Sequence, residues 1–167
     1  MSEVVEILQR ELGITRASDP RPVLATVNVA MCTVFIGYDQ ENGIGFLGHF
    51  DFPGNTSVLP TLFNTLRNLS GNSATYKCTI LGGNKYGWAR SPTTRRKIHL
   101  AASFASTKYG INIQIEHEAP YQKLFKKTAL KFDTRNGEIG PHPQRITMLS
   151  LGALLLNKPV RIIYEPK

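Results

Sequence analysis

Two Asn-Gly pairs, each set between apolar segments, constrain most strongly how this chain of 167 residues folds. Asn and Gly adopt positive φ angles at little cost, so such a pair between two apolar runs is a strong signal for a β-hairpin. Asn42-Gly43 predicts a hairpin over residues 32–50, and Asn136-Gly137 predicts one between residues 128–132 and a strand near Ile139. Antiparallel strands are therefore the starting point of the expected fold.

Apolar patterning around these hairpins predicts further strands and two main helices. Pro92 and Gly110 bracket the longer helix, because proline suits a first turn and glycine a C-terminal cap. The apolar stretch over 149–156 fits either type. The expected strands are 22–37 with an interruption at 28–31, 75–81, 111–116 and 160–164, and the expected helices are 3–13, 57–69 and 92–109.

The predicted fold class is α/β, in layers, with a mainly antiparallel or mixed sheet. An apolar fraction of 41% and a charged fraction of 19% are typical of a folded domain. Residues 1–21 are expected to form an N-terminal helix and linker, because prolines at 20 and 22 follow the helical pattern. Residues 22–167 are expected to form one domain.

The formal net charge of +8 raises the question of an acidic partner. The bases gather modestly over residues 90–97 and 123–131, a pattern typical of an ordinary solvated surface. Few aromatics lie between them and no helix-turn-helix or RNA-recognition signature appears, which disfavours nucleic acid. No apolar run approaches the roughly 20 residues of a membrane span, and Met1-Ser2-Glu3 does not begin a classical secretion signal.

The two cysteines, Cys32 and Cys78, show no spacing typical of a metal site or a disulfide framework. Reduced thiols in a cytosol are therefore expected, and no metal or other cofactor is predicted. Cys78 lies inside an apolar strand pattern, which predicts a core position.

Cys32 and His49 lie on opposite strands of the first predicted hairpin. If its turn centres on Gln40 and Glu41, they face each other directly, with Cβ atoms about 4.5–5.5 Å apart. If it centres on Asn42-Gly43, they lie one diagonal step apart. A neighbouring imidazolium lowers a thiol pKa and holds a thiolate for attack on an amide carbon. The alternative is an inert, buried cysteine.

Four segments strengthen the catalytic interpretation, and the second places His49 seventeen positions after Cys32. They are TVNVAMCTVFIGYD (26–39), GHFDFP (48–53), ILGG (80–83) and LKFDTRNGE (130–138). In this order and at these intervals, over residues 23–140, they resemble the CheD chemoreceptor glutamine deamidases. The resemblance departs at Asn28 and at Ala30-Met31, where the family carries glycine and Gly-Ser.

The resemblance implies a layered fold with a catalytic β-hairpin and a Cys-His-Thr site. Cys32 would be the nucleophile, His49 the general base and Thr26 the residue that orients the imidazole. Substrate binding and oxyanion stabilisation would involve the backbone near Asn28 and Met31, together with Gly82 and Gly83. Gly82-Gly83 would either line the site by close backbone approach or simply end a strand.

The expected activity is conversion of a glutamine side chain of a target protein to glutamate, without a cofactor. The same fold and chemistry occur in cytotoxic necrotizing factor and Burkholderia lethal factor, which implies an effector role. A cytoplasmic protein is expected, or one delivered to a host cell by a route that leaves no classical signal. One alternative is an inactive CheD-like binding module that docks an acidic partner. Transglutaminase or protease chemistry from the same nucleophile is a third.

Overall fold

The computed structural model describes residues 3–27, 29, 32–83, 90–119, 129–143, 160–164 and 166. The strands are β1 (Val4–Ile7), β2 (Glu11–Arg16), β3 (Val23–Thr26), β4 (Thr33–Asp39), β5 (Ile44–Phe50), β6 (Thr75–Gly82), β7 (Asn112–Glu118), β8 (Leu130–Asp133), β9 (Glu138–Pro141) and β10 (Arg161–Tyr164). The helices are α1 (Leu59–Ser70), α2 (Ser91–Ser103) and α3 (Ala105–Tyr109), and the 3-10 helix η1 (Pro53–Val58) precedes α1.

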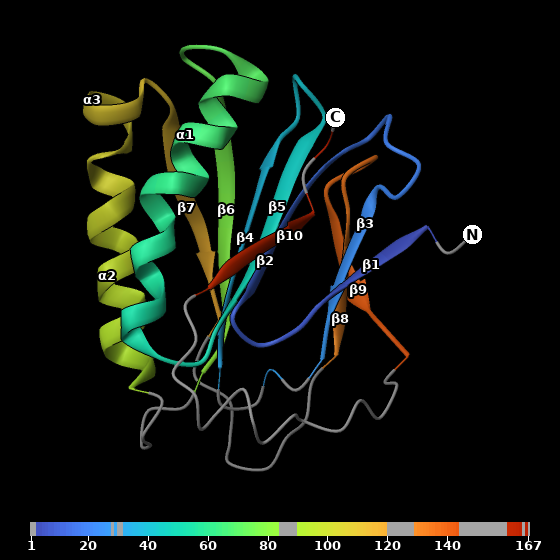
Figure 1. Ribbon diagram of the computed structural model, residues 1–167, viewed down its shortest axis with the longest axis horizontal. Helices are drawn as coiled ribbons and strands as arrows, with labels where there is room; N and C mark the ends of the chain where they lie inside the picture. The colour runs from blue at the N-terminus through green and yellow to red at the C-terminus, as the bar shows by residue number, and fades with distance from the viewer. Residues whose placement is uncertain are drawn as a thin grey trace.

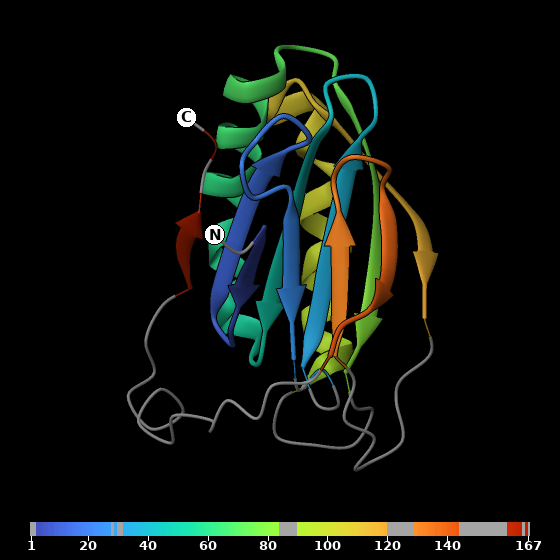
Figure 2. The same ribbon diagram turned by 90° about the vertical axis from the view of Figure 1, so that its right-hand side faces the viewer.

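These elements form three layers (Figure 1). The middle layer is a six-stranded sheet in the order β10-β2-β5-β4-β6-β7, and the second sheet has the order β1-β3-β8-β9. Helices α1 and α2 cover one face of the six-stranded sheet, and the four-stranded sheet packs on the other (Figures 1 and 2). Both sheets mix parallel and antiparallel pairs. The predicted α/β class with mixed sheets is confirmed.

Both hairpins predicted from the Asn-Gly pairs are present, as β4–β5 and β8–β9. The two main helices are confirmed as α1 and as α2 followed by α3, with Gly110 in the left-handed conformation at the end of α3. The strand over 22–37 is interrupted as expected, because the chain leaves the four-stranded sheet after β3 and enters the six-stranded sheet at β4. The apolar stretch 149–156 lies outside the described residues.

The helix predicted over residues 3–13 is wrong, because this segment forms β1, a tight turn and β2. Its apolar residues face two different cores: Ile7 packs between the sheets, whereas Leu12 and Ile14 pack under the helices. The backbone reverses at Arg10, whose φ of 62° no helix contains. β1 pairs with β3 and β2 with β5, so the segment expected to form a separate helix and linker contributes to both sheets.

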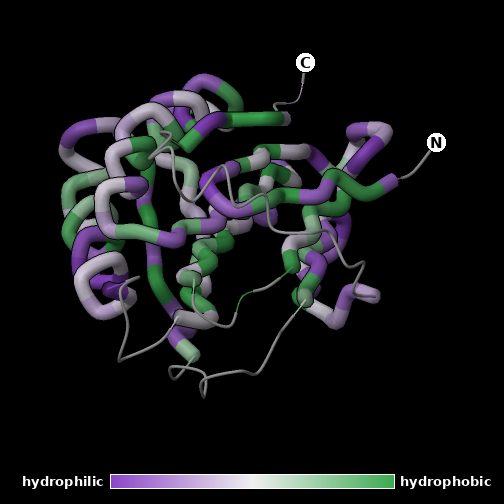
Figure 3. The backbone as a smooth tube through the Cα atoms, turned by 60° about the horizontal axis from the view of Figure 1, so that its bottom comes forward, coloured by the Kyte–Doolittle hydropathy of each residue, from purple (hydrophilic) through white to green (hydrophobic). Residues whose placement is uncertain are grey.

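Two hydrophobic cores fill the spaces between the three layers, one under the helices and one between the two sheets. Figure 3 shows the hydrophobic positions along the strands and helices that form these layers. The helix-side core is the larger and contains the Phe35–Phe46 ring pair, with centroids 5.1 Å apart. Among the described residues, no helix is long and apolar enough to cross a membrane. The inter-sheet core is built from Val5, Ile7, Leu24, Val29, Val34, Ile36, Leu47, Leu130 and Phe132.

Candidate functional site

His49 lies at one end of the inter-sheet core and links the two sheets. It sits on β5 opposite Val34 and its side chain is fully buried. Its Nδ1 lies 2.7 Å from Oγ1 of Thr26, on β3 of the other sheet. The Thr26 hydroxyl donates its proton to the carbonyl oxygen of Ile7, at 2.6 Å. Because that proton is committed, the imidazole Nδ1–H donates to Thr26, which leaves the lone pair on Nε2.

The second imidazole nitrogen, His49 Nε2, is buried and has no hydrogen-bond partner among the described residues. Burial lowers the pKa of His49 to about 4, so the imidazole is neutral at pH 7. Leaving a buried polar atom unpaired costs about 1–3 kcal/mol, and native proteins rarely tolerate this without a reason. A neutral imidazole with a fixed tautomer and a free Nε2 lone pair can accept a proton at that nitrogen, and its lowered pKa makes it a weak base.

Cys32 lies directly before β4 and is 3% exposed. Thr33 pairs with Phe50, so Cys32 continues the ladder opposite Asp51, one diagonal step from His49 and on the same face. The direct opposition of Cys32 and His49 is therefore wrong. The turn spans residues 40–43, where the Asp39 carboxylate accepts the backbone N–H groups at 41 and 42, and its centre falls midway between the two predicted positions.

The thiol is neutral as well. Burial, and to a smaller extent the nearby Asp51 carboxylate, raise the pKa of Cys32 to about 12. A hydrogen bond from Gln9 and the Arg10 guanidinium act in the opposite direction. The predicted thiolate–imidazolium pair is therefore replaced by a neutral thiol and a neutral imidazole on the same face of the hairpin, so an attack by the sulfur would require its proton to leave in the same step.

An ion pair closes the end of the hairpin beside this group. Arg10 Nε contacts both oxygens of the Asp51 carboxylate at 2.9 and 3.0 Å, with each side chain 9% exposed. The Asn55 side-chain amide donates to the same carboxylate. The backbone N–H of Arg10 donates to the carbonyl oxygen of His49 at 2.9 Å. The turn before β2 is thereby fixed to the strand that carries the imidazole.

Gly82 ends β6 and packs against the backbone of Cys32, whereas Gly83, which follows, lies against Ser91 and Thr33. Gly82 has a φ of 69°, and a Cβ there would lie 2.7 Å from the carbonyl oxygen of Cys32. Only glycine fits such a contact. The Gly82 carbonyl oxygen accepts a hydrogen bond from Arg95 Nη2 at 2.5 Å. The other predicted oxyanion positions, Asn28 and Met31, lie outside the described residues.

Arg95 does not belong to a solvated basic surface. Its residue exposure is 4%, and its Nη1 contacts Glu118 at 2.5 Å. Its role is to connect α2 and β7 to the end of β6. Of the basic cluster 123–131, only Lys131 falls within the described part of the chain. Within that part, no group of three His, Cys, Asp or Glu side chains is arranged to hold a metal ion.

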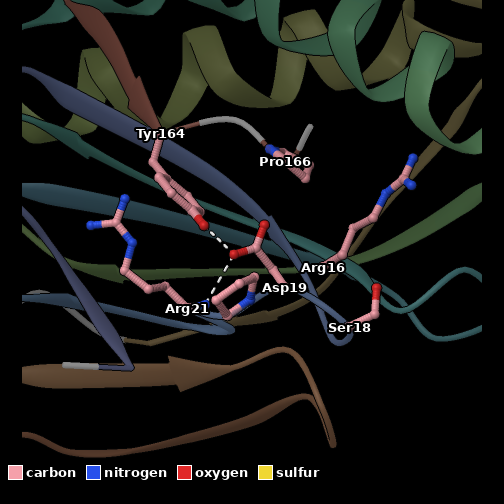
Figure 4. A pocket seen from close by; sticks show the side chains of 7 residues that line it. Arg16, Ser18, Asp19, Arg21, Tyr164 and Pro166 are labelled. Atoms are coloured by element: carbon pink, nitrogen blue, oxygen red, sulfur yellow. Dashed lines mark hydrogen bonds between the residues drawn. The ribbon is translucent and has the colours of Figure 1, made fainter. Parts of the chain in front are cut away.

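A separate pocket of about 450 Å³ lies at the turn after β2 and contains none of the Cys-His-Thr residues (Figure 4). Its polar groups largely satisfy one another. Asp19 accepts hydrogen bonds from the Tyr164 hydroxyl and the Arg21 backbone, and the Arg21 guanidinium lies 4.4 Å from the centre of the Tyr164 ring. The lining residues are Arg16, Ser18, Asp19, Pro20, Arg21, Tyr164 and Pro166.

The sequence predicts that Thr26, Cys32 and His49 share one site. In the structure Thr26 contacts His49, and Cys32 lies on the same face of the β4–β5 hairpin as His49. The sequence-based prediction missed Gln9 and Arg10, because both were assigned to a helix. The alternation of buried residues at Val5 and Ile7 is the signal that could have revealed the strand and turn. No protein-family model matches the chain, and no curated protein matches it.

Proposed function

We propose that this chain is a protein-glutamine deamidase in which Cys32 is the nucleophile and His49 the general base. One observation carries the proposal: the fully buried His49 has Nδ1 fixed by Thr26 and a free Nε2. That nitrogen belongs to the face on which Cys32 lies. A purely structural histidine bridging two sheets would gain from a partner on both nitrogens, whereas a base needs one of them open.

The reaction is acyl transfer to water. His49 Nε2 takes the thiol proton as the Cys32 sulfur bonds to the carbon of a glutamine side-chain amide. The resulting tetrahedral intermediate expels ammonia, which receives the proton from His49 and leaves a thioester. Water, deprotonated by His49, then breaks the thioester and releases glutamate and the free thiol. Thr26 keeps the imidazole oriented throughout and itself exchanges no proton with the substrate.

The depth of the thiol favours a side-chain amide over a main-chain amide. At 3% exposure, Cys32 is reached more easily by a carboxamide on a flexible stem than by a folded protein's peptide bond. This argues for deamidation and against the protease alternative. Two exposed apolar side chains, Leu8 and Phe52, directly neighbour Gln9 and Asp51 in the chain, and such residues suit contact with a protein substrate.

Both described thiols are free, which suits a reducing compartment, and we place the activity in a cytosol, of the producing cell or of a host. The binding-module alternative loses support at Arg95, because this residue is buried and paired rather than available for docking. No separate observation favours that alternative.

The test is incubation of the purified chain with candidate proteins and glutamine-containing peptides. Ammonia release would be measured together with intact mass, which detects amide-to-acid conversion. We expect product from the wild type and from Cys78→Ser, and none from Cys32→Ser. A primary amine added in parallel reports transglutamination by its incorporation. Absence of product from the wild type across the panel, or full activity in Cys32→Ser, would contradict the proposal.

A further inference from the structure

The turn between β1 and β2 carries a side chain that contacts the reacting sulfur. Gln9 is half-buried, and its Nε2 donates a hydrogen bond to Cys32 Sγ at 3.4 Å. Its neighbour Arg10 binds Asp51, the residue opposite Cys32 in the ladder. Two consecutive residues of one turn thus face the nucleophile, one as a neutral donor and the other as part of a buried ion pair.

The turn holds Gln9 firmly in this position. The backbone N–H of Glu11 donates to the Leu8 carbonyl oxygen at 3.1 Å, and the Glu11 side chain accepts the Leu8 N–H at 2.9 Å. Arg10 adopts a φ of 62°, which a non-glycine residue keeps only when its surroundings fix it. The Arg10–Asp51 pair and the bond from Arg10 N–H to the His49 carbonyl oxygen supply that restraint.

Because the Gln9 N–H lies beside the Cys32 sulfur, it also lies near the substrate oxygen that becomes negative when the sulfur attacks. When the sulfur attacks an amide carbon, charge passes to the amide oxygen, one bond away from the carbon. A preorganised N–H in that position stabilises the charge without reorganising during the reaction. Burial and the Asp51 carboxylate both disfavour negative charge on the Cys32 sulfur, whereas the hydrogen bond from Gln9 favours it.

We propose that Gln9 is a catalytic residue whose side-chain N–H stabilises the Cys32 sulfur and then the oxyanion of the tetrahedral intermediate. The inference rests on the proposed deamidase function and adds a donor that the Cys-His-Thr site lacks. The amide takes no part in bond making or breaking: the thiol proton moves to His49, and the Gln9 proton stays on nitrogen.

Gln9→Met tests this, because methionine keeps the length of the side chain and removes the donor. We expect kcat to fall about 100-fold with KM little changed. The rate of Cys32 alkylation by iodoacetamide should also fall. Gln9→Glu should be slower still in both assays, because it adds negative charge. A merely structural role predicts the reverse order, since Glu matches the shape of Gln better than Met. Gln114→Met, at an exposed position of β7, is the matched control, and thermal melts confirm folding.

Three results would overturn the role of Gln9. Full turnover in Gln9→Met, with an active wild type, would remove it from catalysis. Faster alkylation and turnover in Gln9→Met would show that Gln9 covers the thiol. Conversion of Gln9 to glutamate in the purified wild type, with Gln9 intact in Cys32→Ser, would show that Gln9 is a substrate of the enzyme and not a catalytic residue. An inactive wild type would instead refute the deamidase function and the catalytic role together, and the alkylation order would still test donation to the sulfur.

Discussion

The two faces of the six-stranded sheet each bury one cysteine, and the comparison between them defines the site. Cys78 lies on the helix-side face among Phe35, Phe46 and Ile80, and its thiol donates to the Tyr76 carbonyl oxygen, at 3.5 Å. Cys32 lies at the end of the inter-sheet face. There the apolar core gives way to His49, Thr26 and the turn that carries Gln9.

Burial does not distinguish the two thiols. Cys78 is 1% exposed and Cys32 3%, and burial raises the pKa of both. The difference lies in the polar groups that each face presents. Cys78 lies within an apolar cluster, whereas Cys32 shares its face with the His49 imidazole, whose Nε2 has no partner among the described residues. Depth alone therefore does not distinguish a functional cysteine from a structural one, and the proposed role of Cys32 rests on its polar neighbours.

The largest expected effect separates the two cysteines directly. Cys32→Ser should lower deamidase turnover at least about 1,000-fold, because the serine hydroxyl is a far weaker nucleophile under a neutral imidazole. Cys78→Ser should retain turnover, although it buries a hydroxyl in an apolar core and lowers the melting temperature. Ammonia release and melting curves check both. Equal losses of turnover in the two variants would remove the distinction between the faces.

His49 should make stability depend on acid pH. Its pKa is about 4 in the folded state and 6.5 unfolded, so between these values the unfolded chain binds the extra proton. Stability is therefore full above pH 6.5 and falls toward pH 4, by up to about 3 kcal/mol from this residue. Denaturant unfolding of wild type and of His49→Gln at pH 7 and pH 4 measures how much the free energy of unfolding of each protein falls between the two pH values. His99→Gln, at an exposed position, controls for the loss of a histidine. The same fall in the free energy of unfolding for wild type and for His49→Gln would refute a buried neutral imidazole at position 49.

Thr26→Val should reduce turnover about 10-fold, corresponding to about 1.4 kcal/mol of transition-state stabilisation. The imidazole would lose the acceptor that fixes its tautomer, and the Ile7 carbonyl oxygen would lose its donor. Thr15→Val is the matched control, because this fully buried hydroxyl donates to the Arg21 carbonyl oxygen away from the imidazole. Both variants should lose stability, and only Thr26→Val should lose turnover. Parallel losses of turnover would mean that Thr26 acts only through folding.

The smallest expected effect concerns the exposed apolar residues beside the site. Leu8→Ser and Phe52→Ser should each raise KM for a protein substrate a few-fold, roughly 1 kcal/mol of lost apolar contact. Alkylation of Cys32 should not change. Leu100→Ser, which removes a leucine from α2 that is 58% exposed against 42% for Leu8, should leave KM unchanged. A similar rise in KM for Leu100→Ser would show that the protein substrate does not dock beside Cys32.

Much of the fold follows from local signals in the sequence. The Asn-Gly pairs specify both hairpins, and Pro92 and Gly110 bracket the α2–α3 segment. The error over residues 3–13 has a tertiary cause: buried residues that face two different cores lie close to a 3.6-residue period. The hairpin register depends on Asp39, whose side chain stabilises a four-residue turn that the Asn-Gly pair does not determine by itself.

The site was predictable only in part, for related reasons. Spacing and motif order placed Thr26, Cys32 and His49 together, but not the contact of Thr26 with the imidazole across two sheets. The neutral states of Cys32 and His49 could not be predicted either, since they depend on burial by residues distant in the chain. Gln9 and Arg10 reach the site only because β1 and β2 belong to different sheets, a feature of topology rather than of local sequence.

The most direct test of the Cys32–His49 pair is labelling of the native protein with a peptide whose reactive glutamine is replaced by a chloroketone analogue. Peptide mapping by mass spectrometry locates the adduct. We expect labelling of Cys32 in the wild type, none at Cys78, and a large loss of labelling in His49→Gln. Labelling of Cys78 at the same rate, or unchanged labelling of Cys32 in His49→Gln, would contradict a catalytic Cys32–His49 pair.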